Sequence, residues 1–217
     1  MKLRKNKTGY SPGNFTDITK QELLSMFLED LLKESQRFFK YFDLFAGAGI
    51  YYKGTNKEFK GAAILVLETI SSSNRDFKAY LNEKNKTLRE ELQSNVQQYS
   101  NNVEVFGAYQ NYIKEYIKKA DKDSLFLIDP TKLKDYEDKG KTKGILYFLN
   151  DLLKTEAKLF LYAPESVGIE QAAAHKKIIE KILQTIENSG REYSDFKPDK
   201  NYTKGFLERV DHNIIVF

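Results

Sequence analysis

Hydrophobic residues along the chain follow two alternating kinds of spacing, one typical of strands and one typical of helices. Short apolar or alternating runs predict strands at 42–45, 77–83, 103–106, 124–128, 157–162, 193–197 and 212–217. Helical spacing lies between most of them, at 61–70, 86–98, 109–119, 144–153 and 173–186. A further helix is expected before the first strand, capped by Thr19. This order predicts an α/β fold with a mostly parallel, seven-stranded sheet and helices on both faces.

Length and composition are those of one globular domain. The chain has 217 residues, 41% of them hydrophobic, and no Pro/Gly/Ser-rich linker divides it, so we expect a single domain over 1–217, with 1–38 forming a loop and helix before the first strand. There is no cysteine, and the two histidines, His175 and His212, lie far apart. We therefore expect neither disulfides nor a metal site. We expect His175 on a helix surface.

The sequence lacks the features of a membrane or exported protein. No stretch approaches the roughly 20 apolar residues of a membrane helix, and the basic start at 1–5 is not followed by an apolar segment of signal-peptide type. We expect a cytoplasmic protein with no membrane partner. The net charge of +4, from 35 basic and 31 acidic residues, permits nucleic acid binding without demonstrating it.

The segment 40–49 joins a buried strand to a glycine turn. Phe42 to Phe45 provide the apolar run of an interior strand, and Gly47 and Gly49 permit backbone conformations and a close approach that side chains would block. Such a turn accepts a nucleotide-like ligand. Glycines two apart also occur in ordinary tight turns, so this signal is weak by itself.

An acidic residue at the end of the second predicted strand adds to this signal. Glu83 ends the second predicted strand, where its carboxylate can accept hydrogen bonds from ribose hydroxyls; a terminal Glu is otherwise simply solvated. The distance from Gly49 to Glu83 exceeds the roughly 20 residues of a dinucleotide-binding fingerprint, and the third glycine is missing. A nicotinamide enzyme is therefore disfavoured. There is no Gly-Lys-Ser/Thr, so a P-loop is absent as well.

The fourth long strand ends at Asp129-Pro130. A carboxylate at this corner, with a nearby backbone carbonyl, can accept the two N–H hydrogens of an exocyclic amine and orient the nitrogen toward an electrophilic methyl group. Asp-Pro is also a common turn former. The charge-rich stretch 132–143 that follows is expected to be a solvated loop, with a substrate-facing lid as the alternative.

These motifs together resemble a known family. The order of 42–49, an acid after the second strand and Ile128-Asp129-Pro130 resembles Rossmann-like S-adenosylmethionine-dependent methyltransferases of class I. More narrowly, 13–20 followed by a helix, then 43–49 with Tyr51 close behind, resembles the RlmJ-type adenine-N6 methyltransferases of ribosomal RNA and the three-Cys-motif partner proteins.

The resemblance implies a role for each matching residue. The cofactor, S-adenosyl-L-methionine, would be held through its amino acid portion by Asp43 and the backbone of Phe45, Ala46, Gly47 and Gly49. Asn14 and Lys20 would lie near its carboxylate, and Glu83 would bind its ribose. The family's acidic residue near the adenine is missing around Ala108, so the contact there would come from the backbone or from another side chain. Asp129 and Pro130 would face the target amine as the catalytic residues.

Several departures leave alternatives open. The family's Asp-Pro-Pro-Tyr is Asp129-Pro130-Thr131-Lys132 here, which removes an aromatic ring expected to stack on adenine, and the RNA-contacting insertion after the first glycine turn is missing. Tyr51, Tyr52, Tyr136 and Tyr162 are candidates to replace that ring. The predicted function is methylation of adenine N6 in RNA or DNA. The alternatives are a small-molecule or protein methyltransferase, and an inactive cofactor-binding subunit whose protein partner supplies substrate recognition.

Overall fold

The structure is a computed structural model that describes residues 15–34, 38–52, 54–56, 58–130, 133–164, 169–196 and 212–216. Its helices are α1 (Phe15–Glu34), α2 (Ala62–Ser72), α3 (Lys86–Asn95), α4 (Ile113–Lys119), α5 (Ile145–Leu153) and α6 (Ile169–Ser189). Its strands are β1 (Phe39–Asp43), β2 (Ile50–Tyr51), β3 (Phe59–Lys60), β4 (Phe77–Asn82), β5 (Val103–Phe106), β6 (Ser124–Ile128), β7 (Lys158–Pro164), β8 (Ser194–Phe196) and β9 (His212–Val216). Three short 3₁₀ helices connect them: η1 (Gln97–Tyr99), η2 (Tyr109–Asn111) and η3 (Leu133–Tyr136).

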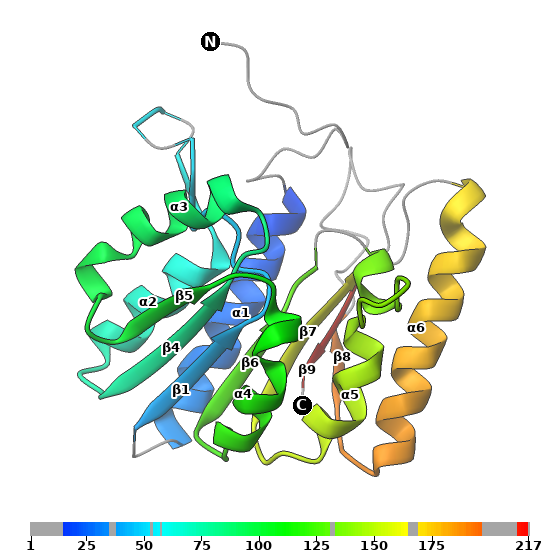
Figure 1. Ribbon diagram of the computed structural model, residues 1–217. Coiled ribbons are helices and arrows are strands. Elements are labelled where there is room, and N and C mark those ends of the chain that lie inside the picture. The colour runs from blue at the N-terminus through cyan, green and yellow to red at the C-terminus, as the bar shows by residue number, and fades with distance from the viewer. Residues whose placement is uncertain are drawn as a thin grey trace.

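One central sheet organises the described residues, in the strand order β5-β4-β1-β6-β7-β9-β8 (Figure 1). Strands β5, β4, β1, β6 and β7 run parallel, while β9 is antiparallel to both β7 and β8. The register pairs Asp43 with Leu81 of β4 and with Leu127 of β6. The carboxyl ends of β4, β1 and β6 therefore lie side by side, as the alternating sequence pattern predicted for a mostly parallel sheet.

Strands β1, β4 and β6 are buried along nearly their whole length, and alternate residues of β1 join different cores. On β1, Phe42 belongs to a core with residues of α4, α5 and α6, whereas Phe39 and Tyr41 belong to a second core with residues of α1, α2 and α3. Figure 1 shows α4, α5 and α6 on the near face of the sheet and α1 behind it. Because both faces are covered, the parallel strands read as continuous apolar runs.

The local structure differs from the sequence expectations in several places. The first strand is Phe39–Asp43 instead of 42–45, and the helix expected at 109–119 is divided into η2 and α4. Thr19 lies inside α1 instead of capping it, because the backbone is already helical from Phe15. A small hairpin of β2 and β3, each two residues long, is too short to produce a periodic signal and was not predicted. The stretch 132–143 contains η3, so it is not a plain loop. No described helix is both long enough and apolar enough to cross a bilayer.

Candidate functional site

Three carboxylates gather at the carboxyl edge of the sheet. Asp43 is the last residue of β1, Glu83 directly follows β4, and Asp129 directly follows β6. These strands are neighbours in the order β4-β1-β6, so one edge carries all three side chains. Open parallel sheets bind ligands at this edge. The structure thus brings together the three acids that the sequence predicted as site residues.

Asp43 is held inside the protein by its own chain. Its carboxylate is 1% exposed; the Tyr41 hydroxyl donates to Oδ2 at 2.8 Å, and the Phe45 N–H donates to Oδ1 at 2.9 Å. Burial raises the pKa of Asp43 to about 7, although both hydrogen bonds favour the ionised form and act against this rise. Asp43 therefore acts on the turn after β1 through the Phe45 backbone, and its carboxylate does not face open solvent.

The glycine turn depends on both of its glycines. Gly47 and Gly49 have φ values of +62° and +77°, which favour glycine. A Cβ on Gly47 would overlap the Tyr51 hydroxyl, and one on Gly49 would lie 2.9 Å from Leu92 Cδ1. The chain then folds back on itself, since the Gly61 N–H donates to the Gly49 carbonyl at 2.6 Å. The turn is consequently enclosed by the β2–β3 hairpin and α3.

Asn82, at the end of β4, holds the other side of the same turn. Its side-chain Nδ2 donates to the Asp43 carbonyl at 2.9 Å, and its own carbonyl accepts the Ala46 N–H at 2.9 Å. The Tyr116 hydroxyl donates to Asn82 Oδ1 at 3.1 Å, which orients the amide. Both side chains are 1% exposed. Buried polar groups of this kind are stabilising when they are hydrogen-bonded, and the Asn82 amide nitrogen, the Asn82 amide oxygen and the Tyr116 hydroxyl each have a partner here.

Glu83 connects β4 to the glycine turn and to α3. The Asn85 N–H donates to Glu83 Oε1 at 2.6 Å, and the Gly47 N–H also donates to this carboxylate. Partial burial raises the pKa of Glu83 above its usual value, while these two bonds and the nearby Lys84 and Arg89 charges act in the opposite direction. A carboxylate accepts about four hydrogen bonds, so Glu83 retains acceptor capacity toward the site.

Asp129 forms an ion pair with Lys20 of α1. Lys20 Nζ lies 2.6 Å from Asp129 Oδ2, and the two side chains are 11% and 19% exposed. The same ammonium lies 4.6 Å from the centre of the Tyr162 ring. Pro130, next to Asp129, is buried. The sequence suggested Lys20 for the cofactor's carboxylate, and the structure also gives it a contact with the predicted catalytic acid.

The aromatic candidates differ in accessibility. Tyr136 is fully buried, and its hydroxyl donates to the Tyr162 carbonyl at 2.7 Å. The prediction that Tyr136 stacks on a base is wrong, because η3 turns this ring into the core instead of toward solvent. Tyr162 is 6% exposed beneath Lys20, so its face is covered. Tyr51 and Tyr52 are half-buried.

The predicted adenine contact lies beside the glycine turn. Ala108, half-buried, directly precedes η2, where its carbonyl accepts the Asn111 N–H at 3.2 Å. The next residue, Tyr109, packs its ring 5.2 Å from that of Phe45. The loop after β5 is therefore in contact with the turn after β1. Asn14, Thr131 and Lys132 lie outside the described residues, as does the side chain of His175.

The sequence reasoning missed three residues that shape the site. Tyr41 and Asp43 are two apart on one strand, so their shared face was readable from the spacing. Asn82 is a polar residue ending an otherwise apolar strand, which is also a usable signal. Tyr116 carries no such signal in the sequence, because nothing distinguishes it from the other tyrosines, of which the chain has 14 in all, until the chain is folded.

Comparison with known proteins identifies the fold. No protein-family model matches the chain, and no curated protein matches it in sequence. The solved structures that resemble it include protein LPL1258 from Legionella pneumophila (TM-score 0.66, 14% identity, 95% of this chain and 86% of that one). A second is the N-terminal domain of EvdMO1 with SAH bound (TM-score 0.58, 12% identity, 95% of this chain and 84% of that one). A third is the METTL16 methyltransferase domain (TM-score 0.52, 12% identity, 92% of this chain and 82% of that one).

At these identities the likeness establishes the fold alone. The chain has an α/β Rossmann-like methyltransferase fold with five parallel strands, so the predicted α/β Rossmann-like class with a mostly parallel sheet and helices is confirmed.

Proposed function

We propose that the chain binds S-adenosylmethionine and transfers its methyl group to an amine, namely N6 of adenine in RNA or DNA. The observation that carries this proposal is the carboxyl edge itself, where the glycine turn lies between Glu83 and Asp129 within a methyltransferase fold. One structural neighbour, the EvdMO1 domain, was crystallised with SAH, the product form of this cofactor. The sequence resemblance to adenine-N6 methyltransferases supplies the choice of amine.

The residues present fit the cofactor. The positive φ values of Gly47 and Gly49 keep the turn tight, and the Glu83 carboxylate beside it retains acceptor capacity for hydroxyl donors such as those of a ribose. Asp43, through Phe45, and Asn82, through Ala46, keep the turn in the shape that presents its backbone. The backbone from Phe45 to Gly49 would hold the amino acid portion, together with Asn14 and Lys20, and Ala108 would border the adenine.

When bound, the cofactor supplies an electrophilic methyl group. Asp129 accepts an N–H of the target amine and thereby orients the nitrogen lone pair, so the protein's main contribution is positioning. Lys20 holds the Asp129 carboxylate in place. Pro130 has no backbone N–H, so it offers no hydrogen-bond donor next to Asp129. No covalent enzyme intermediate is required.

Asp129→Asn tests the catalytic half of the proposal. The variant keeps the side-chain shape but loses the carboxylate acceptor, so we expect methyl transfer to fall roughly 100-fold or more. Cofactor affinity, measured by calorimetry, should stay within a few-fold. Mass analysis of nucleosides after incubation with mixed RNA and DNA measures the product. Turnover equal to that of the wild type would exclude the role of Asp129.

A second candidate is a cofactor-binding subunit without activity of its own. Two observations favour it: Thr131-Lys132 replaces the expected Pro-Tyr, and Lys20 already pairs with Asp129. This candidate predicts tight cofactor binding with no methylated product from RNA, DNA, proteins or small amines. Product formed only from protein or small amines would instead identify the third alternative, a methyltransferase that does not act on nucleic acid.

A further inference from the structure

The segment between β6 and α5 forms a small hairpin at the carboxyl edge of the sheet. We call residues 137–144 the basic hairpin; Figure 1 shows the chain between β6 and α5 above the start of α5. Lys139 and Thr142 exchange two backbone hydrogen bonds of 2.8 Å, which closes a two-residue loop. Gly140 occupies the first loop position with φ +55°, as type II′ turns require. The hairpin tip therefore has a defined backbone.

The base of the basic hairpin is anchored to the core. A Cβ on Gly144 would lie 2.5 Å from the Glu137 backbone, so the two ends of the hairpin approach as closely as glycine permits. Asp138 Oδ1 accepts the Gly144 N–H at 3.0 Å, and Gln110 donates to the Lys143 carbonyl at 3.3 Å. Directly before the hairpin, Tyr136 is fully buried. This anchoring reduces the conformational entropy that a binding partner would have to remove.

The acidic residues from 135 to 138 are paired with lysines, whereas two lysines of the basic hairpin have no acidic partner among the described residues. Asp135 pairs with Lys84 at 3.3 Å, Glu137 pairs with Lys181 at 3.3 Å and Asp138 pairs with Lys143 at 2.7 Å. Lys139 and Lys141 are exposed at the hairpin tip, and neither forms an ion pair with any residue that the structure describes. The tip therefore presents two uncompensated positive charges.

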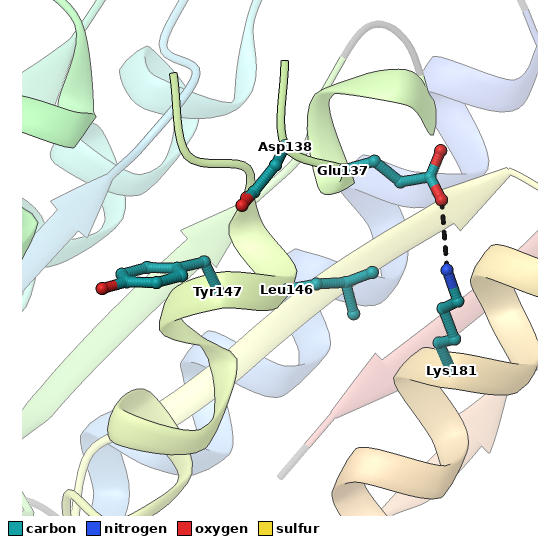
Figure 2. Close-up of a pocket in the computed structure, with 5 residues that line it drawn as sticks. All are labelled: Glu137, Asp138, Leu146, Tyr147 and Lys181. Carbon is teal, nitrogen blue, oxygen red and sulfur yellow. Dashed lines mark hydrogen bonds and ion pairs between the residues drawn. The ribbon is translucent and has the colours of Figure 1, made fainter. Parts of the chain in front are cut away.

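An aromatic side chain and a pocket lie beside the basic hairpin. The pocket has a volume of about 520 Å³ and is lined by Glu137, Asp138, Leu146, Tyr147 and Lys181 (Figure 2). Tyr147 is 50% exposed, and Lys143 Nζ lies 4.4 Å from the centre of its ring. Exposed aromatic rings next to cations are the combination that binds single-stranded nucleic acid, through base stacking and phosphate contacts.

We propose that the basic hairpin binds the nucleic acid substrate, with Lys139 and Lys141 contacting its phosphate backbone and Tyr147 stacking on one of its bases. The inference rests on the proposed function, because it assigns substrate contacts beside Asp129. Burial and then the negative charge of Asp129 raise the pKa of Tyr136, so Asp129 lies within electrostatic range of the residue that directly precedes the hairpin. Phosphate contacts position a substrate without reading its sequence.

The test measures how binding depends on salt. Fluorescence anisotropy with a labelled single-stranded RNA, across a series of NaCl concentrations, gives the slope of log affinity against log salt for the full chain. Lys139→Gln with Lys141→Gln removes two phosphate contacts, so the slope should become shallower by about 1.4, with about tenfold weaker binding at low salt. Tyr147→Leu should weaken binding about tenfold without changing the slope, since stacking releases no counterions.

The matched control is Lys122→Gln with Lys154→Gln. It removes the same charge from the opposite edge of the sheet, where both lysines are exposed in the segments leading into β6 and β7. The control should keep the wild-type slope. An unchanged slope in the hairpin variant, or an equal change in the control, would overturn the inference.

A separate calorimetric titration with S-adenosylmethionine distinguishes this inference from the proposed function. Cofactor binding without any wild-type affinity for RNA or single-stranded DNA at low salt would refute the basic hairpin as a substrate contact and leave the cofactor site standing. Failure to bind the cofactor would refute the proposed function, while the salt slopes would still decide the role of the hairpin.

Discussion

The two halves of the site are held by different forces. Around the glycine turn, buried and partly buried hydrogen bonds connect Asp43, Asn82 and Glu83 to the backbone of the turn. Around Asp129 and the segment after it, ion pairs predominate. Lys20–Asp129 is largely buried, with side chains 11% and 19% exposed, whereas the pairs after it, such as Lys84–Asp135, involve exposed lysines. Buried hydrogen bonds that lose a partner are costly, whereas exposed ion pairs contribute little and weaken in salt.

This difference matches the tasks that we propose for the two halves. A cofactor of constant structure is best held by a backbone turn of constant shape. A nucleic acid strand varies in sequence and conformation, and a charged, partly exposed surface accommodates that variation. We therefore expect substitutions at the glycine turn to have large effects that do not depend on salt. Substitutions among the exposed ion pairs after Asp129 should have small effects on stability that do depend on salt; Asp129 itself, as the proposed catalytic acid, is not one of these positions.

The largest effect is expected from Gly47→Ala. The new Cβ would overlap the Tyr51 hydroxyl at a backbone φ of +62°, so the turn must change shape. We expect cofactor affinity to fall roughly 100-fold and stability to fall by about 1–3 kcal/mol. Calorimetry and urea unfolding measure the two effects.

Gly190→Ala is the control for Gly47→Ala. Gly190 also has a positive φ, of +69°, but a Cβ there meets no atom within 4 Å. Only the conformational cost should remain, with unchanged cofactor affinity. Equal cofactor affinity in the two variants would contradict the importance of the turn.

An intermediate effect is expected from the buried carboxyl of Asp43. Its pKa is raised from 3.8 to about 7 in the folded state, so the folded protein binds the extra proton and stability decreases as pH rises toward 7. Between pH 5 and pH 7 this contribution amounts to about 2 kcal/mol. Asp43→Asn cannot titrate and should lack this part of the pH dependence. Parallel pH profiles of urea unfolding for the two proteins would refute the raised pKa.

The smallest effect is expected from the ion pairs of the second half. Lys84→Gln removes the charge that pairs with Asp135, where the lysine is 63% exposed. The free energy of unfolding should change by less than about 1 kcal/mol, and the difference should disappear at about 0.5 M NaCl. A larger loss that persists at high salt would show that this pair acts as the buried hydrogen bonds do, which would remove the contrast between the two halves.

The pattern of the sequence was sufficient for the order of the helices and the strands of the central sheet, and for three site acids, but not for the β2–β3 hairpin. Apolar runs such as 124–128 record burial on both faces, and a strand's carboxyl end follows from its direction, so the sequence alone places Asp43, Glu83 and Asp129 on one edge. The glycines were equally readable, because Gly47 and Gly49 follow a buried strand in a position that needs a turn.

Only the tertiary structure decided which side chains meet. Lys20 and Asp129 are 109 positions apart, and Tyr116 and Asn82 are 34 apart, so neither pairing leaves a periodic trace in the sequence. The inward turn of Tyr136 and the neutralised acids before Lys139 likewise depend on how α5, α6 and η3 pack. Periodicity reports which face of an element is buried, whereas the choice of partner across that face depends on the packing of elements that are distant in the sequence.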